Sequence, residues 1–343
     1  MTRAELSRTA LTLGIGGLGA AFFGLIGFPA APLTGPAAAV SLASVAGLRV
    51  LIPPRLRDAC FLVLGLSIGS TVTPEVVATA RAWPLSLLAL SVTLVLTLVV
   101  VRAILQSGFG FDRVTALLAS TPGHLSFVLA ISSELRADIP KVAMVQSVRV
   151  LLLTLLVPLI IAVTGAEGTP GLGTAGPAAP LALAVLFALA LGAGLGLGRL
   201  RVPAPLLIGG ILVSAIGHGT DLTPGTVPGW MTVSAFVVMG ALIGARFNGL
   251  SRAEVFSGLG AGVAATLAAC ALAAVGAGLA SLIVDVSPGA LLLAFAPGGV
   301  EVMAALAVET GLEPAFVAAH HVSRLMFLTV IFPVLLAMVR GRA

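Results

Sequence analysis

Long apolar runs, separated by short polar turns, follow one another along the whole chain. In the first half, they predict helices over residues 9–28, 33–48, 56–73, 83–103 and 140–163. In the second half, they predict helices over 178–199, 203–217, 229–247, 253–283 and 314–338. Most of these runs approach or exceed the ~20 apolar residues that cross a bilayer as a helix. The run at 253–283 is too long for one straight crossing, so we expect a tilt or an exposed turn.

The chain contains two copies of one unit, 175 residues apart. Leu117–Gly123 reads LLASTPG and Leu292–Gly298 reads LLAFAPG, and the same shift continues without a gap to Pro158 and Pro333. The sequence therefore predicts a duplicated protein. Its predicted parts are a first transmembrane repeat at 1–163, a linker loop at 164–177 and a second repeat at 178–343.

A helix-breaking Pro-Gly interrupts one apolar segment in each copy, at 113–138 and at 288–312. If each segment enters the membrane and returns as a re-entrant hairpin, each copy has five crossings, and nearly all loop arginines fall on one side. Arg81 is the exception. This arrangement follows the positive-inside rule and places both termini in the cytoplasm. Because five is odd, the second repeat is inverted relative to the first, as in many secondary transporters.

Composition supports the membrane class and excludes others. The chain is 59% hydrophobic and only 9% charged, whereas soluble domains carry roughly 25% charged residues. The apolar runs do not alternate, which excludes a membrane β-barrel. The net charge of +5 is spread over loop ends, so we expect a lipid bilayer and no nucleic acid as partner. The fold class is thus an all-α polytopic membrane protein.

The Pro-Gly breaks are the first candidate binding elements. Each break frees backbone amides and carbonyls, which in a membrane must face protein, water or a ligand. The helix that restarts after the break directs its positive N-terminal end at the tip. The candidate substrate-binding residues at the first tip are Pro122, Gly123, His124 and Ser126, and at the second tip Pro297, Gly298, Gly299 and Glu301. Glu301 is the best candidate for a protonatable coupling group, or else it caps its own helix.

Two arginines lie deep inside apolar helices and are the second candidate feature. Arg149 is eight residues past Lys141, about 12 Å of helix rise, and Arg324 is its counterpart. Such charges persist only if they are paired or hydrated. They either grip an oxyanion together with His321, which shares a helix face with Arg324, or form struts with hairpin carbonyls, Glu301 or the repeated pair Glu134 and Glu309.

The paired blocks Thr121–Ser126 and Ala296–Met303, each followed by an arginine-bearing helix, resemble the AbrB-duplication family of bacterial integral membrane proteins. The similarity covers essentially the whole chain. Family members usually show Pro-Gly-Gly at both breaks, and His124 departs from this pattern. The resemblance implies a multi-pass protein of the bacterial inner membrane. Labels used in the family include regulator and ammonia monooxygenase.

Three functions compete on the sequence. The first is a secondary transporter for a small anionic solute, coupled to H⁺ or Na⁺, with no cofactor or metal. The second is a membrane-embedded regulator or sensor that does not transport. The third is a membrane oxygenase, but four histidines and two isolated cysteines make a poor copper or di-iron site. We therefore expect no enzyme activity. A homo-oligomer is a further expectation, because such assemblies are common among hairpin-bearing transporters.

Overall fold

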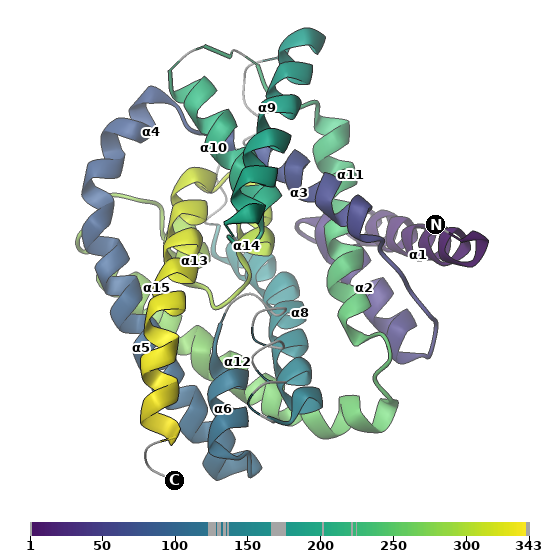
Figure 1. Ribbon diagram of the computed structural model, residues 1–343, viewed down its shortest axis with the longest axis vertical. Helices are drawn as coiled ribbons and strands as arrows, with labels where there is room; N and C mark the ends of the chain where they lie inside the picture. Colours follow the sequence, from purple (N-terminus) through teal and green to yellow (C-terminus); the bar gives the residue numbers. More distant parts are fainter. Residues whose placement is uncertain are drawn as a thin grey trace.

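The computed structural model describes residues 2–122, 128, 132, 135, 137–165, 176–200, 202–220, 222–223 and 225–340, without side chains at 332–340. All regular elements in this part of the chain are helices (Figure 1). The first half holds α1 (Arg3–Leu25), α2 (Ala31–Val45), α3 (Pro54–Gly69), α4 (Pro74–Thr79), the 3₁₀ turn η1 (Ala80–Ala82), α5 (Trp83–Phe109), α6 (Arg113–Ser120) and α8 (Ile139–Thr164). The second half holds α9 (Pro180–Arg199), α10 (Pro205–Gly219), α11 (Gly229–Gly244), the 3₁₀ turn η2 (Ala245–Phe247), α12 (Arg252–Ala280), α13 (Pro288–Phe295), α14 (Val300–Thr310) and α15 (Pro314–Arg340).

Seven helical stretches in the described residues are long and apolar enough to cross a bilayer, and they point to a membrane protein. They are α1, the stretch from α4 through α5, α8, α9, the stretch from α11 through η2, α12 and α15. The other three predicted spans are helices as well, but shorter: α2 and α10 have 15 residues each and α3 has 16. The predicted run 253–283 is one helix of 29 residues, α12, followed by a turn at 281–283.

The same local signals begin equivalent helices in the two halves. Ala30 and Ala204 precede α2 and α10 with φ of 51° and 47°, a left-handed conformation that is unusual for alanine. A proline stands at the first or second position of both helices, where its missing N–H costs nothing. The repeat in sequence is therefore also a repeat of backbone geometry.

Glycines let helices approach closely within each half. A Cβ added at Gly19 of α1 would lie 2.5 Å from the carbonyl oxygen of Gly35 in α2. The equivalent contact joins α9 and α10, where a Cβ at Gly209 would lie 2.5 Å from the amide nitrogen of Gly194. Not every glycine of the α1 run serves this purpose, because a Cβ at Gly17 would meet nothing within 4 Å.

Glycines also join the two halves. A Cβ at Gly65 of α3 would lie 2.4 Å from the carbonyl oxygen of Leu207 in α10. At the equivalent place, a Cβ at Gly240 of α11 would lie 2.3 Å from the carbonyl oxygen of Leu33 in α2. Backbone-to-backbone contacts of this kind need small residues, as is usual between membrane helices. Helix α3 thus packs on α10, the counterpart of α2, and α2 packs on α11, the counterpart of α3. These two contacts join the halves.

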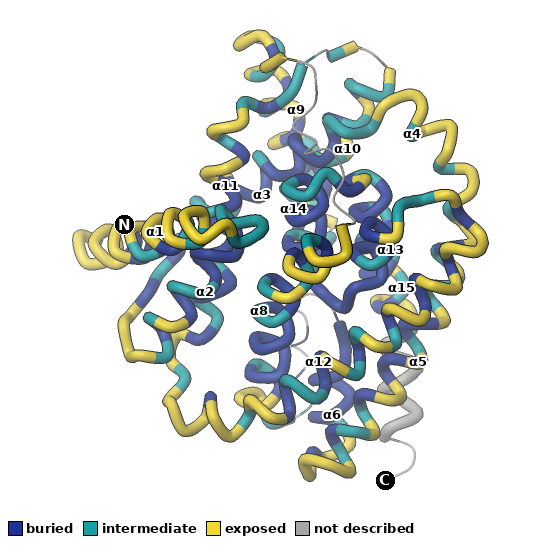
Figure 2. Tube along the Cα trace, turned by 180° about the vertical axis from the view of Figure 1, so that it is seen from behind, coloured by how far each residue is buried: buried dark blue, intermediate teal, exposed yellow. Residues whose placement is uncertain are grey.

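The broken segment of the second half lies at the centre of the molecule. Figure 2 shows buried residues gathered around α8, α13 and α14, whereas α1, α4 and α9 carry many exposed ones. Residues 302–307 of α14 are fully buried. At the edge of this core, the half-buried Trp83 packs edge-to-face on Phe316 at 5.4 Å between ring centroids. The core thus encloses the break at residues 296–299.

Candidate functional site

Arg324 binds the carbonyl groups freed by the second break. Helix α13 ends at Phe295 and α14 begins at Val300, so the carbonyls of Ala296 and Gly298 have no partner within either helix. Arg324, 1% exposed, donates from Nη1 to the Ala296 oxygen at 2.6 Å and from Nη2 to the Gly298 oxygen. The guanidinium therefore caps the C-terminal end of α13, where a positive charge is also favoured by the helix dipole.

His321 completes this arrangement from the same helix, α15. Its Nε2 donates to the carbonyl oxygen of Leu293 at 2.9 Å, and its Nδ1 faces Nη2 of Arg324 within hydrogen-bonding distance. His321 is fully buried. The sequence prediction that His321 and Arg324 share one helix face agrees with this contact. We call His321, Arg324 and the carbonyls they bind the second clamp.

The first half builds the same arrangement with one residue exchanged. Arg149 donates from Nη2 to the Thr121 oxygen at 3.3 Å and to Oε1 of Gln146. Gln146 donates from Nε2 to the oxygens of Leu118, at 3.2 Å, and Thr121, at 2.8 Å. Every one of these residues precedes its counterpart in the second clamp by 175 positions. We call Gln146, Arg149 and their carbonyl partners the first clamp.

In both clamps the arginine binds backbone carbonyls, which is one of the structural roles that the sequence left open. Neither Arg149 nor Arg324 forms a salt bridge with a carboxylate in the described residues. The two charges interact with each other, and Arg324 also interacts with Glu301. The Nε atoms of both arginines are buried and have no hydrogen-bond partner within the described part of the chain. One donor of each guanidinium thus remains unused.

The remaining predicted site residues fall into two groups. Gly123, His124, Ser126 and Glu134 lie outside the described residues. Pro122, Pro297 and Gly298 are buried beside the clamps, and a Cβ at Gly298 would lie 2.7 Å from Cγ of Met303. Gly299 and Glu309 are half-buried, and the described structure gives the Glu309 carboxylate no hydrogen bond or ion pair. The binding and coupling roles of all these residues stay predictions.

Glu301 faces an arginine that the sequence analysis treated only as a topology signal. Its Oε1 lies 3.7 Å from Nη2 of Arg246, and both side chains are mostly buried, with 14% and 17% exposure. Helix α14 has no side-chain cap, so Glu301 does not take the capping role. The position of Arg246 inside the predicted span 229–247 was a sign that its charge needs a partner. An ion pair with Glu301, 55 residues away, leaves no local sequence pattern, however.

Arg246 and Glu301 line a cleft of about 740 Å³ bounded by α3, α9, α10, α11 and α14. Its other charged lining residues are Arg57, Asp58 and Arg199. Arg57 and Asp58 form an exposed ion pair at 2.7 Å. Three guanidinium groups against two carboxylates give the described wall a positive balance, which favours an anion over a cation.

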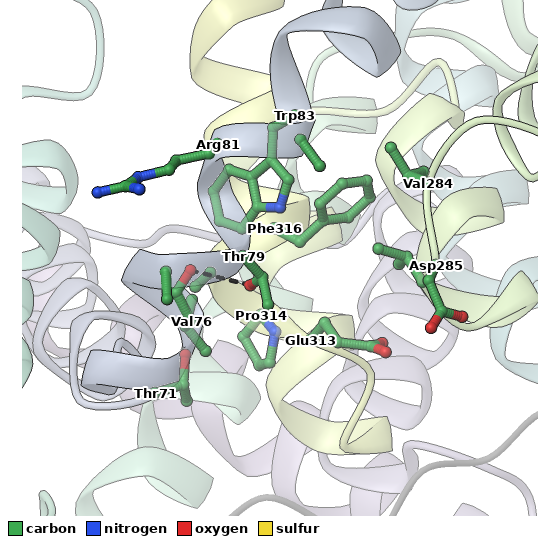
Figure 3. Close-up of a pocket in the computed structure, with 14 residues that line it drawn as sticks. Thr71, Val76, Thr79, Arg81, Trp83, Val284, Asp285, Glu313, Pro314 and Phe316 are labelled. Carbon is green, nitrogen blue, oxygen red and sulfur yellow. Dashed lines mark hydrogen bonds between the residues drawn. The ribbon is translucent and has the colours of Figure 1, made fainter.

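A second cleft, of about 410 Å³, lies where η1 meets the start of α15 (Figure 3). Trp83 and Phe316 form one wall, Asp285 and Glu313 lie on the opposite side, and Arg81 points away. Glu313 adopts a φ of 34° and accepts a hydrogen bond from Oγ of Ser287 at 2.6 Å. In the predicted topology, this cleft lies on the opposite membrane side from the Arg246 cleft.

The described residues contain no group of three or more His, Cys, Asp or Glu that could hold a metal ion. Cys60 and Cys270 are both free.

Comparison with known proteins places these features in a family. The chain is 26% identical over 289 residues to the "Uncharacterized protein YhjN" of Bacillus subtilis (strain 168), covering 79% of this chain and 75% of that protein. It is 27% identical over 304 residues to the "Putative regulator AbrB" of Escherichia coli (strain K12), covering 87% and 86%. The family model described as "Transition state regulatory protein AbrB" matches residues 32–340, so the chain belongs to the AbrB family.

Proposed function

We propose that this protein is a secondary transporter that moves a small anionic solute by alternating access, coupled to H⁺ or Na⁺. The observation that carries the proposal is the pair of equivalent clamps, each holding a broken helix at its C-terminal end with a buried arginine. Discontinuous helices whose ends meet near the membrane centre are the usual substrate and ion sites of such transporters.

Helix directions support an inverted relation between the repeats. Helices α3 and α11 are equivalent, and Cys60 Sγ donates to the Ala235 oxygen at 3.0 Å while Ser67 and Thr232 hydroxyls meet at 3.0 Å. As the numbering rises along α3 it falls along α11, so the two helices run in opposite directions. Equivalent helices that run antiparallel are expected when one repeat is inverted in the membrane.

The next pair of equivalent helices agrees. A Cβ at Gly276 of α12 would lie 2.3 Å from Oγ1 of Thr93 in α5, and a Cβ at Gly260 would lie 3.5 Å from the ring of Phe109. Again the numbering rises along one helix and falls along the other. Two equivalent pairs at different places in the molecule thus support the inversion.

Helix lengths support the re-entrant reading of the second break. Helix α13 has 8 residues and α14 has 11, which correspond to about 12 Å and 16 Å of rise. Neither reaches across a hydrocarbon core of about 30 Å. A hairpin that enters to about half depth and returns fits these lengths and brings the Arg246 cleft to its tip.

The positive balance of that cleft supports an anion as the solute. We infer that an oxyanion binds Arg246 in competition with Glu301, because the 3.7 Å separation of this ion pair is longer than a strong charge-assisted hydrogen bond. Release of Glu301 from this ion pair would free Arg246 for the solute, and an ion-coupled cycle needs such a link.

Counterflow in proteoliposomes tests the proposal. Full-length protein is reconstituted, the vesicles are loaded with unlabelled succinate, phosphate or sulfate, and uptake of the matching labelled anion is followed. We expect the wild-type protein to accumulate at least one of these probes transiently. Glu301→Gln should change the rate by about tenfold or more, because the ion pair with Arg246 is lost.

Glu75→Gln serves as the matched control, because Glu75 is an exposed carboxylate on α4 outside both clefts. It should behave as the wild type. No counterflow of any of the three probes would contradict the transport proposal. Counterflow that is identical in wild type and Glu301→Gln would remove Glu301 from the site and leave transport standing.

The names in the family favour a second candidate, a membrane-embedded regulator that binds a ligand without moving it. The matching family model and the relative from Escherichia coli are both described as regulatory. This candidate predicts that a bound anion raises the melting temperature of the purified protein, by linkage of binding to stability, while counterflow stays absent. The two readouts together separate it from transport.

A further inference from the structure

The two clamps differ in one position that decides whether a proton can act on them. Gln146 and His321 are equivalent, and each donates from Nε2 to a carbonyl while offering an acceptor to the neighbouring arginine. An amide side chain does not titrate at any physiological pH, whereas an imidazole does. Protonation can therefore change the hydrogen bonds of the second clamp but not those of the first.

Hydrogen bonding fixes the protonation state of His321 in the closed clamp. The Leu293 oxygen only accepts, so Nε2 carries the hydrogen, at 2.9 Å. The Arg324 guanidinium only donates, so Nδ1 must present its lone pair. A second proton on Nδ1 would face the guanidinium N–H directly, donor against donor and positive charge against positive charge. The closed clamp therefore holds neutral His321.

Among the described residues, no carboxylate hydrogen-bonds His321 to relieve such a clash. Helix α15 packs against α3, α5, α6, α13 and α14. The ionisable groups on these helices are Arg55, Arg57, Asp58 and Cys60 on α3, Arg102 on α5, Arg113 on α6, and Glu301 and Glu309 on α14, with none on α13. The charged or titratable groups found to interact with His321 are Arg324 and His320, both on its own helix.

We propose that a proton opens the second clamp by binding His321, and that the first clamp, with Gln146 in this place, stays closed. A proton on Nδ1 breaks the bond from Arg324, and the guanidinium then withdraws from the Ala296 and Gly298 carbonyls. The break at residues 296–299 is released while that at Thr121 stays held. The assignment of this proton as the coupling ion rests on the proposed transport function.

The sign of the linkage follows from which state binds the proton. The closed clamp excludes it and the open clamp accepts it, so lower pH favours the open clamp. An unrestrained imidazole titrates near about 6.5, so the open-to-closed ratio should rise about 30-fold between pH 7.5 and pH 5.0. Above neutral pH the ratio should level off.

Hydrogen–deuterium exchange of the full-length protein in lipid nanodiscs measures this opening without any ligand. Peptides covering 288–299 report on the second clamp, and those covering 113–122 report on the first as an internal control. After correction for the intrinsic pH dependence of exchange, we expect about 30-fold faster exchange at pH 5.0 than at pH 7.5 in 288–299, and no change in 113–122.

Exchanging Gln146 and His321, the residues that differ between the clamps, tests their role. His321→Gln copies the first clamp, keeps both hydrogen bonds and should abolish the pH response of 288–299. Gln146→His should create a response in 113–122. His320→Gln is the control for a neighbouring buried histidine, because His320 hydrogen-bonds Ser86 at 2.8 Å and the Phe316 oxygen at 2.9 Å, and neither partner belongs to a clamp. It should respond as the wild type.

A pH response of 288–299 that survives in His321→Gln, or an equal response of both segments in the wild type, would overturn the inference. Anion counterflow without His321-dependent exchange would also overturn it and would leave the transport proposal standing. His321-dependent exchange without counterflow would support a proton-sensitive clamp in a protein that does not move these anions.

Discussion

At the residue scale, the buried arginines stabilise the fold by binding backbone carbonyls, whether or not a ligand is present. Arg149 and Arg324 satisfy backbone carbonyls that the helix breaks leave without partners. A buried polar group without a partner costs about 1–3 kcal/mol, and more when charge is involved. Each arginine therefore contributes to stability through the helix end that it caps.

Removal of the second guanidinium should be costly. We expect Arg324→Ala to lower the free energy of unfolding by about 3 kcal/mol, because the buried Gly298 carbonyl loses its side-chain donor and the Ala296 carbonyl keeps only the Gly298 N–H. Thermal unfolding in detergent measures this against Arg8→Ala, an exposed arginine on α1 that should change stability by less than about 0.5 kcal/mol. Equal melting temperatures for the two variants would contradict a stabilising role of the second clamp.

The sequence located both arginines and His321 and offered hairpin carbonyls as one of several alternative partners, but it did not choose among them or identify the individual carbonyls. Arg149 and Arg324 stood out because charges are rare in apolar helices, and His321 because it lies one turn before Arg324. Their acceptors are main-chain oxygens of Thr121, Ala296 and Gly298, which every residue has and no sequence pattern marks. The Glu301–Arg246 ion pair escaped for a similar reason, since it joins two elements that are distant in sequence.

At the element scale, glycine contacts set how closely helices of different halves approach. Gly65 of α3 abuts the Leu207 carbonyl of α10, and the backbone of a packed helix cannot move aside as a flexible side chain can. The helix pairs α3–α10 and α2–α11 therefore depend on the absence of a side chain at single positions.

Gly65→Ala should destabilise the protein by about 1–3 kcal/mol through overpacking, because the added Cβ would lie 2.4 Å from that oxygen. Gly17→Ala is the matched control, since a Cβ at this position in α1 would meet nothing within 4 Å. It should be neutral or stabilise the helix by up to about 1 kcal/mol. Melting temperatures of both variants check the prediction, and a Gly65→Ala protein as stable as Gly17→Ala would contradict it.

Helix positions were largely predictable, whereas helix pairings were not. The apolar runs gave all ten long elements, and the long run 253–283 contains a turn after α12 ends at Ala280. Gly17 and Gly19 look alike in the sequence, but Gly17 is open and Gly19 is tightly packed, because packing depends on the direction each faces. The contact between Trp83 and Phe316 joins residues 233 positions apart, which periodicity cannot reveal.

At the scale of the whole molecule, duplication and interlocking explain why two half-sites meet at one centre. Equivalent helices α3 and α11 touch directly, through the 3.0 Å contact between Cys60 and its counterpart Ala235. One hydrophobic core contains residues of both halves. If one half is inverted, the two broken helices approach the same point from opposite membrane surfaces, which is the geometry that alternating access requires.

The transport mechanism depends on the orientation of the two repeats, and cysteine accessibility measures it most directly. Ser107 and Leu282 are exposed and occupy equivalent positions, in the last turn of α5 and in the turn after α12. In a background with Cys60 and Cys270 replaced by serine, Ser107→Cys and Leu282→Cys are labelled in intact cells with a membrane-impermeant maleimide. We predict that Leu282→Cys is labelled from outside and Ser107→Cys only after the membrane is opened. Labelling of both from the same side would contradict the inverted repeats and the transport mechanism built on them.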